Sequence, residues 1–204
     1  MPSYAALGAL PELAAEVRSS GALARIAELV DAARASGVRI VHAVAERRPD
    51  GRGASRNARL FRAAERLPVR RLTGSAAVRV AAPVQVADED LVVRRLRGLS
   101  PIQGTDVDPL LRDLGCRTLI VTGVSADVAV PDAVFDAVNR GCTVVLPTDA
   151  VAGVPAGYTR AMIRHTPSPV AGPGRPARVD HRGASGGRAP PPPPADPGGR
   201  CDRP

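Results

Sequence analysis

The sequence contains no tryptophan and no lysine, and tyrosine and phenylalanine occur only twice each. A core must therefore be built from valine, leucine, isoleucine and alanine, and no aromatic side chains alternate with basic ones to stack on nucleic-acid bases. The formal net charge is +8, carried entirely by arginines that are scattered among acidic residues. We attribute this composition to a GC-rich genome and expect no specific nucleic-acid partner.

Cysteine is scarce as well. Cys116, Cys142 and Cys201 form no CxxC pair and have no histidine at a spacing suited to zinc, so the sequence predicts no metal site. No phosphate-binding glycine motif is present, and we expect no cofactor. No apolar run approaches the length of a membrane span, and the amino terminus has no signal pattern. These absences predict a cytoplasmic protein with reduced thiols and no membrane contact.

Expected helices and strands alternate along most of the chain. Apolar spacing and glycine stops predict helices at 9–19, 22–36, 58–66, 106–114, 127–140 and 156–165, and strands at 38–45, 91–96, 118–124 and 143–147. Strands separated by helices imply βαβ units and a parallel sheet covered on both faces. We therefore expect an α/β domain over residues 1–166.

Two segments of this pattern are polar. The arginine-rich loop at 46–57 follows a strand and is expected to be a solvated loop, with a place at the mouth of a pocket as the alternative. Residues 167–204 are rich in proline and glycine, include five consecutive prolines, and have almost no apolar periodicity. Such a segment cannot bury enough apolar area to offset its ordering entropy, so we expect a disordered low-complexity tail.

The segment Thr118–Gly141 is the most informative in the chain. An apolar run stops at a glycine, turns through the small residues of GVSADVA, and continues as an amphipathic helix. Open α/β sheets present their ligands and catalytic groups at such strand ends. Ala129 stands at the start of this helix, and its methyl group cannot act as a nucleophile.

Residues 91–155, from LVVRRLRGLSPIQGT through TLIVTGVSADVAV to TVVLPTDAVAGVP, resemble the isochorismatase-like cysteine hydrolases, and the similarity extends over most of 9–166. The resemblance implies a three-layer, Rossmann-like parallel sheet. Family members use an Asp–Lys–Cys triad, with a cis peptide before the nucleophile helix and backbone N–H groups there forming an oxyanion hole.

In this chain none of the three triad positions is intact. The nucleophile position falls at Ala129, and the lysine position at Arg94 or Arg95, with Arg95 the better match. The resemblance places Arg95, Val124, Ser125 and Ala129 in the substrate pocket, with Ser125 at the cis peptide. We interpret Asp127 as a helix cap. Arginine keeps the positive charge but cannot plausibly give up a proton.

The aspartate position and the strand that carries it are absent, since no aspartate occurs before Asp31. In the family that strand lies in the middle of the sheet. We therefore expect an amino-terminally truncated domain in which the strands at 38–45 and 118–124 lack a shared neighbour.

Two functions remain open from the sequence. The first is a hydrolase-like protein that acts on or binds a small amide or vinyl-ether carboxylate, with cysteine-nucleophile activity lost. The second is a non-catalytic pseudoenzyme that binds a small anion or serves as an oligomer partner, since family members are often homo-oligomers. Whether the chain is an enzyme is left open by the altered triad.

Overall fold

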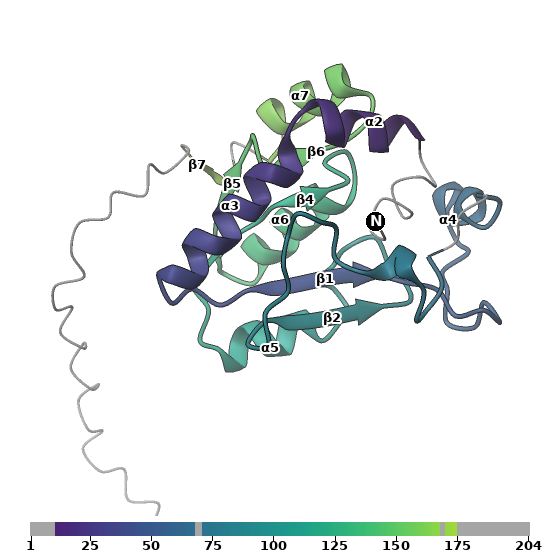
Figure 1. Ribbon diagram of the computed structural model, residues 1–204, viewed down its shortest axis with the longest axis horizontal. Coiled ribbons are helices and arrows are strands. Elements are labelled where there is room, and N and C mark those ends of the chain that lie inside the picture. The colour runs from purple at the N-terminus through teal and green to yellow at the C-terminus, as the bar shows by residue number, and fades with distance from the viewer. Residues whose placement is uncertain (1–10, 68–70, 168–169, 175–204) are drawn as a thin grey trace, which may run out of the picture.

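The computed structural model describes residues 11–67, 71–167 and 170–174. Its helices and strands alternate (Figure 1). The helices are α2 (Pro11–Ser19), α3 (Ala22–Ala35), α4 (Arg59–Ala64), α5 (Val107–Asp113), α6 (Ala129–Asn139) and α7 (Ala156–His165), with a short 3₁₀ helix, η1 (Ala76–Val78). The strands are β1 (Val41–Ala45), β2 (Leu91–Arg95), β3 (Thr118–Ile120), β4 (Gly123–Val124), β5 (Thr143–Pro147), β6 (Val151–Ala152) and β7 (Gly172–Gly174).

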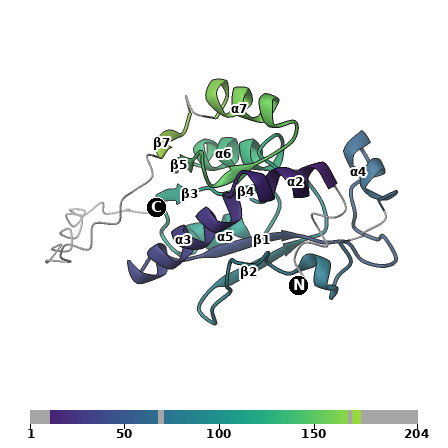
Figure 2. The same cartoon turned by 45° about the horizontal axis from the view of Figure 1, so that its top comes forward.

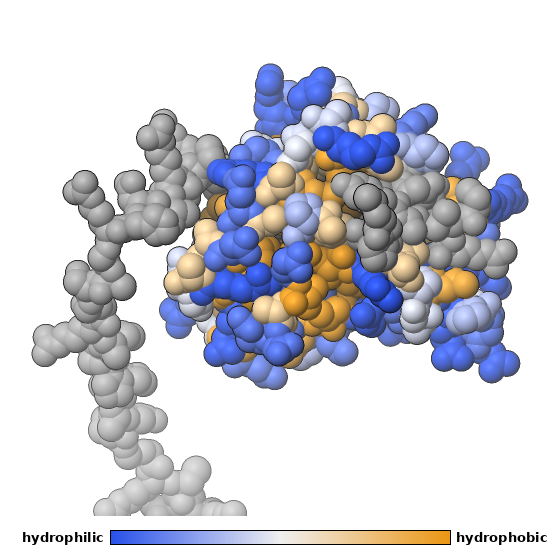
Figure 3. Space-filling model, in the orientation of Figure 1, coloured by the Kyte–Doolittle hydropathy of each residue, from blue (hydrophilic) through white to orange (hydrophobic). Residues whose placement is uncertain are grey.

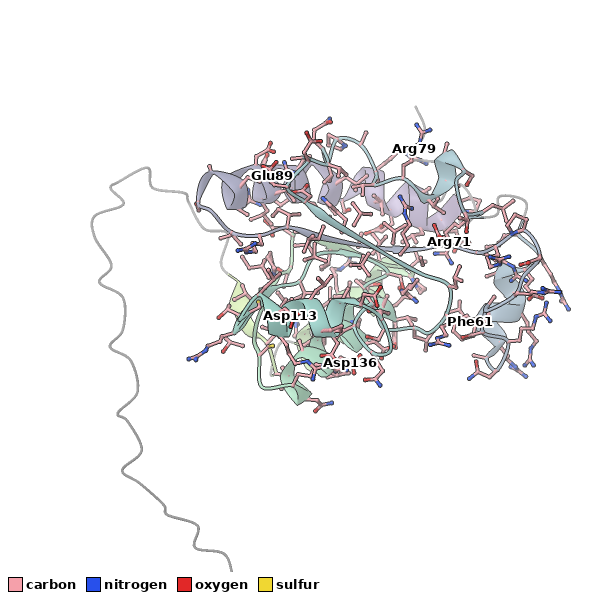
Figure 4. The ribbon with its side chains drawn as sticks, turned by 90° about the horizontal axis from the view of Figure 1, so that it is seen from below. Phe61, Arg71, Arg79, Glu89, Asp113 and Asp136 are labelled. Carbon is pink, nitrogen blue, oxygen red and sulfur yellow. The ribbon has the colours of Figure 1, made fainter. Side chains whose placement is uncertain are left out.

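All the strand pairs in the described part of the chain are parallel, which confirms the predicted α/β class. β1 pairs with β2, β5 lies between β3 and β7, and β4 pairs with β6. The helices cover both faces: in Figure 4 the purple helices α2 and α3 lie on one side of the strands, and the teal and green helices α5 and α6 lie on the other. No helix among the described residues is long and apolar enough to cross a membrane.

A single aliphatic cluster joins the separate strand groups. Its members on α6 are Val130, Ala133, Val134 and Ala137, spaced so that they fall on one face of the helix. They pack with Val93 of β2 and with β5, and Val41 of β1 contacts the same cluster. The core therefore holds β1–β2 and β3–β5–β7 in one domain although no ladder connects them.

The described strands leave a break in the middle of the sheet. The Ile40 carbonyl accepts the Leu91 N–H and the Glu46 N–H donates to the Arg95 carbonyl, so the even-numbered residues of β1 face β2. The backbone groups of Val41, Ala43 and Ala45 consequently point to the other edge, where no described strand pairs. β3 is likewise the end of its ladder. These two edges are the ones that the predicted missing neighbour would leave open, and that prediction stays untested because residues 1–10 lie outside the described part of the chain. In Figures 1 and 2 the β1–β2 pair runs below the other strands.

The segment predicted as one strand at 118–124 is divided in two. β3 ends at Ile120, although the Val121 N–H still donates to the Val145 carbonyl of β5. The Gly123 N–H donates instead to the Ala150 carbonyl, where β4 begins to pair with β6. Gly123 has a φ of 122°, a conformation that residues with a Cβ rarely adopt. The glycine thus lets the chain change from the β5 ladder to the β6 ladder.

The packed domain continues past residue 166. Ala171 is 2% exposed and belongs to the core cluster, and β7 pairs with β5 from Gly172 to Gly174. The rest of the predicted tail, from residue 175 onward, lies outside the described residues, as does the predicted helix start at 9–10.

Candidate functional site

The carboxyl ends of β1 and β2 open into a cavity that contains several arginines. Its wall comes from the end of β1, the loop that follows, α4, Arg71, and the segment from Arg95 to Gly98. The loop at 46–57 contributes Glu46, Arg47, Ala54 and Ser55 to this wall, so the alternative of a pocket mouth fits better than a purely solvated loop. Ligands of open parallel sheets bind at such strand ends.

Arg95 is the last residue of β2 and projects into this cavity, half-buried. Its Nη1 donates to the carbonyls of Arg97 (3.3 Å) and Gly98, which fixes the guanidinium at the cavity wall. Burial lowers the pKa of Arg95, the charge of Arg71 lowers it further, and Asp132 opposes both effects. Its charge is therefore desolvated, without a salt bridge to any described carboxylate.

Arg94, the other candidate for the lysine position, points elsewhere because successive side chains of a strand alternate. Its Nη1 lies 3.4 Å from Oε2 of Glu46 and 3.4 Å from the Val78 carbonyl. It does not line the cavity. Of the two candidates for the lysine position, Arg95 is therefore the one that lines the cavity.

Arg71 is a cavity residue that the sequence did not single out. It follows a segment with no clear periodicity, and its position depends on a backbone bridge. The Arg47 N–H donates to the Arg71 carbonyl (2.7 Å), and the Thr73 N–H donates to the Arg47 carbonyl (2.9 Å). The residue keeps solvent access, yet desolvation by surrounding protein lowers the pKa of its guanidinium. Figure 4 labels it together with Phe61, which contributes to the same cavity.

The turn before α6 has the backbone geometry that the resemblance implies. The Val124–Ser125 peptide is cis. The Ser125 carbonyl accepts the N–H groups of Val128 (3.2 Å) and Val130 (3.0 Å), and α6 begins at Ala129. Val124 is exposed, and the Ser125 side chain makes no hydrogen bond to another described residue.

The prediction that Asp127 caps this helix is wrong. The N-cap residue of α6 is Val128, and no side chain makes a capping hydrogen bond there. Oδ1 of Asp127 is instead buried without a hydrogen-bond partner among the described residues, close to Gly153 and Thr159. These neighbours, Gly153 directly after β6 and Thr159 on α7, are distant in the chain, so the local sequence could not reveal them.

Only one of the four predicted pocket residues lines the cavity. Arg95 lies in its wall, whereas Val124, Ser125 and Ala129 lie outside it. The two regions are still coupled, because Asp132, in the first turn of α6, interacts electrostatically with Arg95. Arg95 thus stands between the arginine-lined cavity and the start of α6.

The described cysteines are far from this edge of the sheet. Cys116 and Cys142 precede β3 and β5, at the amino ends of strands whose carboxyl ends form the candidate site. Burial raises the pKa of the Cys142 thiol, which disfavours the thiolate needed for attack. Cys201 lies outside the described residues. No group of three or more potential metal ligands occurs in the described part of the chain.

Comparison with known proteins agrees with this architecture. Residues 11–172 match the isochorismatase domain family. No curated protein matches the sequence significantly. An isochorismatase family protein from Desulfovibrio vulgaris superposes with a TM-score of 0.67 at 26% identity, covering 75% of this chain and 79% of the other.

Two further structures extend the comparison. A cysteine hydrolase from Pseudomonas syringae has a TM-score of 0.62 at 25% identity, with 70% of each chain covered. N-carbamoylsarcosine amidase from Thermoplasma acidophilum has a TM-score of 0.57 at 20% identity, covering 71% of this chain and 78% of the other. At that identity the amidase shows a shared fold only.

Proposed function

Because the chain belongs to the isochorismatase family, we propose that it is a hydrolase-like protein that binds a small anion through Arg95 without cysteine-nucleophile catalysis. The observation that carries this proposal is the guanidinium of Arg95, which is desolvated at the cavity wall and has no salt bridge to a described carboxylate. A small carboxylate, free or part of an amide or vinyl-ether compound, would supply the missing charge.

The chemistry at the start of α6 supports binding rather than turnover. Ala129 offers no nucleophile, and Arg95 cannot act as a proton donor or acceptor, since a guanidinium stays protonated in proteins. The loss of a nucleophile removes several orders of magnitude in rate, which leaves only positioning by the surrounding groups.

Two measurements test the proposal. The purified protein, incubated with nicotinamide, isochorismate and an N-carbamoyl amide, should release no product above background, and replacing all three cysteines by serine should change nothing. Benzoate binding measured by calorimetry should be lost in Arg95→Gln and kept in Arg112→Gln, because Arg112 is exposed and pairs with Asp108 away from the cavity. Turnover that disappears in Arg95→Ala but survives the cysteine replacements would contradict the proposal and indicate different chemistry.

The second candidate, an oligomer partner, is favoured by the edges of β1 and β3, which have no partner among the described strands. Backbone N–H and C=O groups on an open edge can pair with another chain. Self-association in solution would be its direct sign.

A further inference from the structure

Two guanidinium groups of the cavity have no ion pair with a described carboxylate. Arg71 and Arg95 both line it, desolvation lowers the pKa of each, and the charge of Arg71 lowers the pKa of Arg95 further. Arg71 is exposed and Arg95 is half-buried, and both line the same cavity. Like charges that face one cavity repel each other, which favours an anion between them.

The other charged groups of the cavity are already engaged or exposed. Nη2 of Arg47 lies 2.8 Å from Oε1 of Glu65, and Glu46 pairs with Arg94 and accepts the hydroxyl of Thr73. Arg97 and Arg71 are both exposed, but of the two only Arg71 acts electrostatically on Arg95. We therefore take Arg71 and Arg95 as the pair of unpaired positive charges at the cavity wall.

These two side chains also have unused hydrogen-bond donors. Only Nη1 of Arg95 donates hydrogen bonds, to two carbonyls. Its Nε and Nη2 have no hydrogen bond to a described residue. The Arg71 guanidinium likewise has no side-chain hydrogen bond or ion pair within the described part of the chain. Two guanidinium forks thus offer several N–H groups to one ligand.

The remaining wall is largely apolar. Phe61, Ala64, Leu67 and Leu96 line it beside the arginines. A ligand with a charged end and a small apolar body would bury its body against these side chains while its charge meets the guanidinium groups.

We propose that this cavity binds the monoester of a phosphate, with Arg71 and Arg95 sharing the phosphoryl oxygens and the apolar wall holding the ester group. A phosphate monoester carries nearly two negative charges and three acceptor oxygens, which match two guanidinium forks. A carboxylate carries one charge and two oxygens, which match one fork. This inference rests on the proposed function, because Arg95 serves both.

Phenyl phosphate and phenyl sulfate test the inference, because they share a ring and a tetrahedral oxyanion but differ by one charge at pH 8. In calorimetry with the full chain, phenyl phosphate should bind about tenfold tighter or more, as expected for added charge-assisted hydrogen bonds. In Arg71→Gln, the affinity for phenyl phosphate should fall to the affinity for phenyl sulfate. Arg79→Gln, which removes an exposed charge away from the cavity, should keep the difference. Inorganic phosphate should bind more weakly than phenyl phosphate.

The outcomes separate this inference from the proposal on which it rests. Equal affinities for the two phenyl compounds in the parent protein, or a preference that survives in Arg71→Gln, would overturn the role of Arg71 while leaving anion binding through Arg95 intact. If inorganic phosphate binds as tightly as phenyl phosphate, the apolar wall does not hold the ester group, and that part of the proposal is overturned. Failure of every anion to bind the parent protein would overturn both proposals. The comparison of probes in the parent protein decides the matter even if Arg71→Gln does not fold.

Discussion

At the scale of single residues, Asp90 shows how one carboxylate can connect three segments. Its side chain is 1% exposed and accepts Nε of Arg34 (3.2 Å), the Ala87 N–H (3.0 Å) and a hydrogen bond shared with Nε2 of His42 (2.9 Å). The Arg34 hydrogen bonds, helped by those from His42 and Ala87, hold the pKa of Asp90 well below its usual range against the effect of burial. The carboxylate thereby joins α3, β1 and the start of β2.

We predict that Asp90→Asn lowers the free energy of unfolding at pH 7 by about 2–4 kcal/mol, because it leaves Arg34 beside a neutral partner in a buried place. Asp31→Asn is the matched control, since Asp31 pairs with the same Arg34 at 3.3 Å but is 72% exposed. It should cost less than about 1 kcal/mol. Denaturant unfolding of both variants measures the difference, and equal losses would contradict the role given to burial.

The same carboxylate predicts a pH dependence. A group whose pKa is lowered by folding stabilises the native state above its unfolded pKa, and that contribution is lost as the pH falls toward the folded pKa. The difference in free energy of unfolding between the parent protein and Asp90→Asn should therefore shrink progressively below about pH 4, the ordinary pKa of aspartate. Unfolding curves between pH 7 and pH 2 measure this, and a difference that stays constant across the range would refute it.

Single residues also show what the sequence could predict. His42 lies in the strand predicted at 38–45, and its Nε2 is 2.9 Å from Oδ2 of Asp90. The match of Arg95 to the family pattern located a cavity residue. Arg71 could not be found in this way, because the bridge between Arg47 and Leu72 places it there and nothing in its own segment indicates that bridge.

At the scale of helices and strands, periodicity predicted most of the architecture. β5 and α7 have the predicted bounds, and α6 begins two residues later than expected, at Ala129. The division between β3 and β4 could not be predicted, because it depends on a hydrogen bond from Gly123 to Ala150 that apolar spacing does not encode. Spacing specifies which side of an element is buried, whereas ladder partners are set by the whole sheet.

Close contact between the residue after β6, the turn before α6, and helix α7 gives a prediction at this scale. A Cβ on Gly153 would lie 2.9 Å from the Ala126 nitrogen, from Oδ1 of Asp127 and from Oγ1 of Thr159. Gly153→Ala should therefore lower the melting temperature and reduce the free energy of unfolding by about 1–3 kcal/mol, because backbone and buried side chains must move. Gly157→Ala, in α7 with open space around it, should instead stabilise by up to about 1 kcal/mol. Thermal unfolding compares them, and equal effects would show that the contact is relaxed at little cost.

At the scale of the whole molecule, the open edges of β1 and β3 distinguish this domain from a continuous sheet. The aliphatic cluster keeps the two strand groups together, but their backbone groups at the break lack partners among the described strands. Ile120, on the edge strand β3, is 51% exposed. Figure 3 adds an apolar patch on the face over β1 and β2. Apolar surface beside an open edge is a combination that favours contact with another chain.

We predict that the protein self-associates with increasing concentration through the β3 edge, and that Ile120→Lys weakens this association. A lysine on an edge strand disfavours edge-to-edge pairing, because approach of a second strand would desolvate its charge. Val86→Lys is the matched control, since Val86 is similarly exposed (46%) but lies outside the strands. Sedimentation velocity over a wide concentration range should show a larger average mass for the parent protein and for Val86→Lys than for Ile120→Lys. If both lysine variants associate like the parent, the contact lies elsewhere, and if the parent stays monomeric throughout, the core cluster alone suffices to protect the open edges.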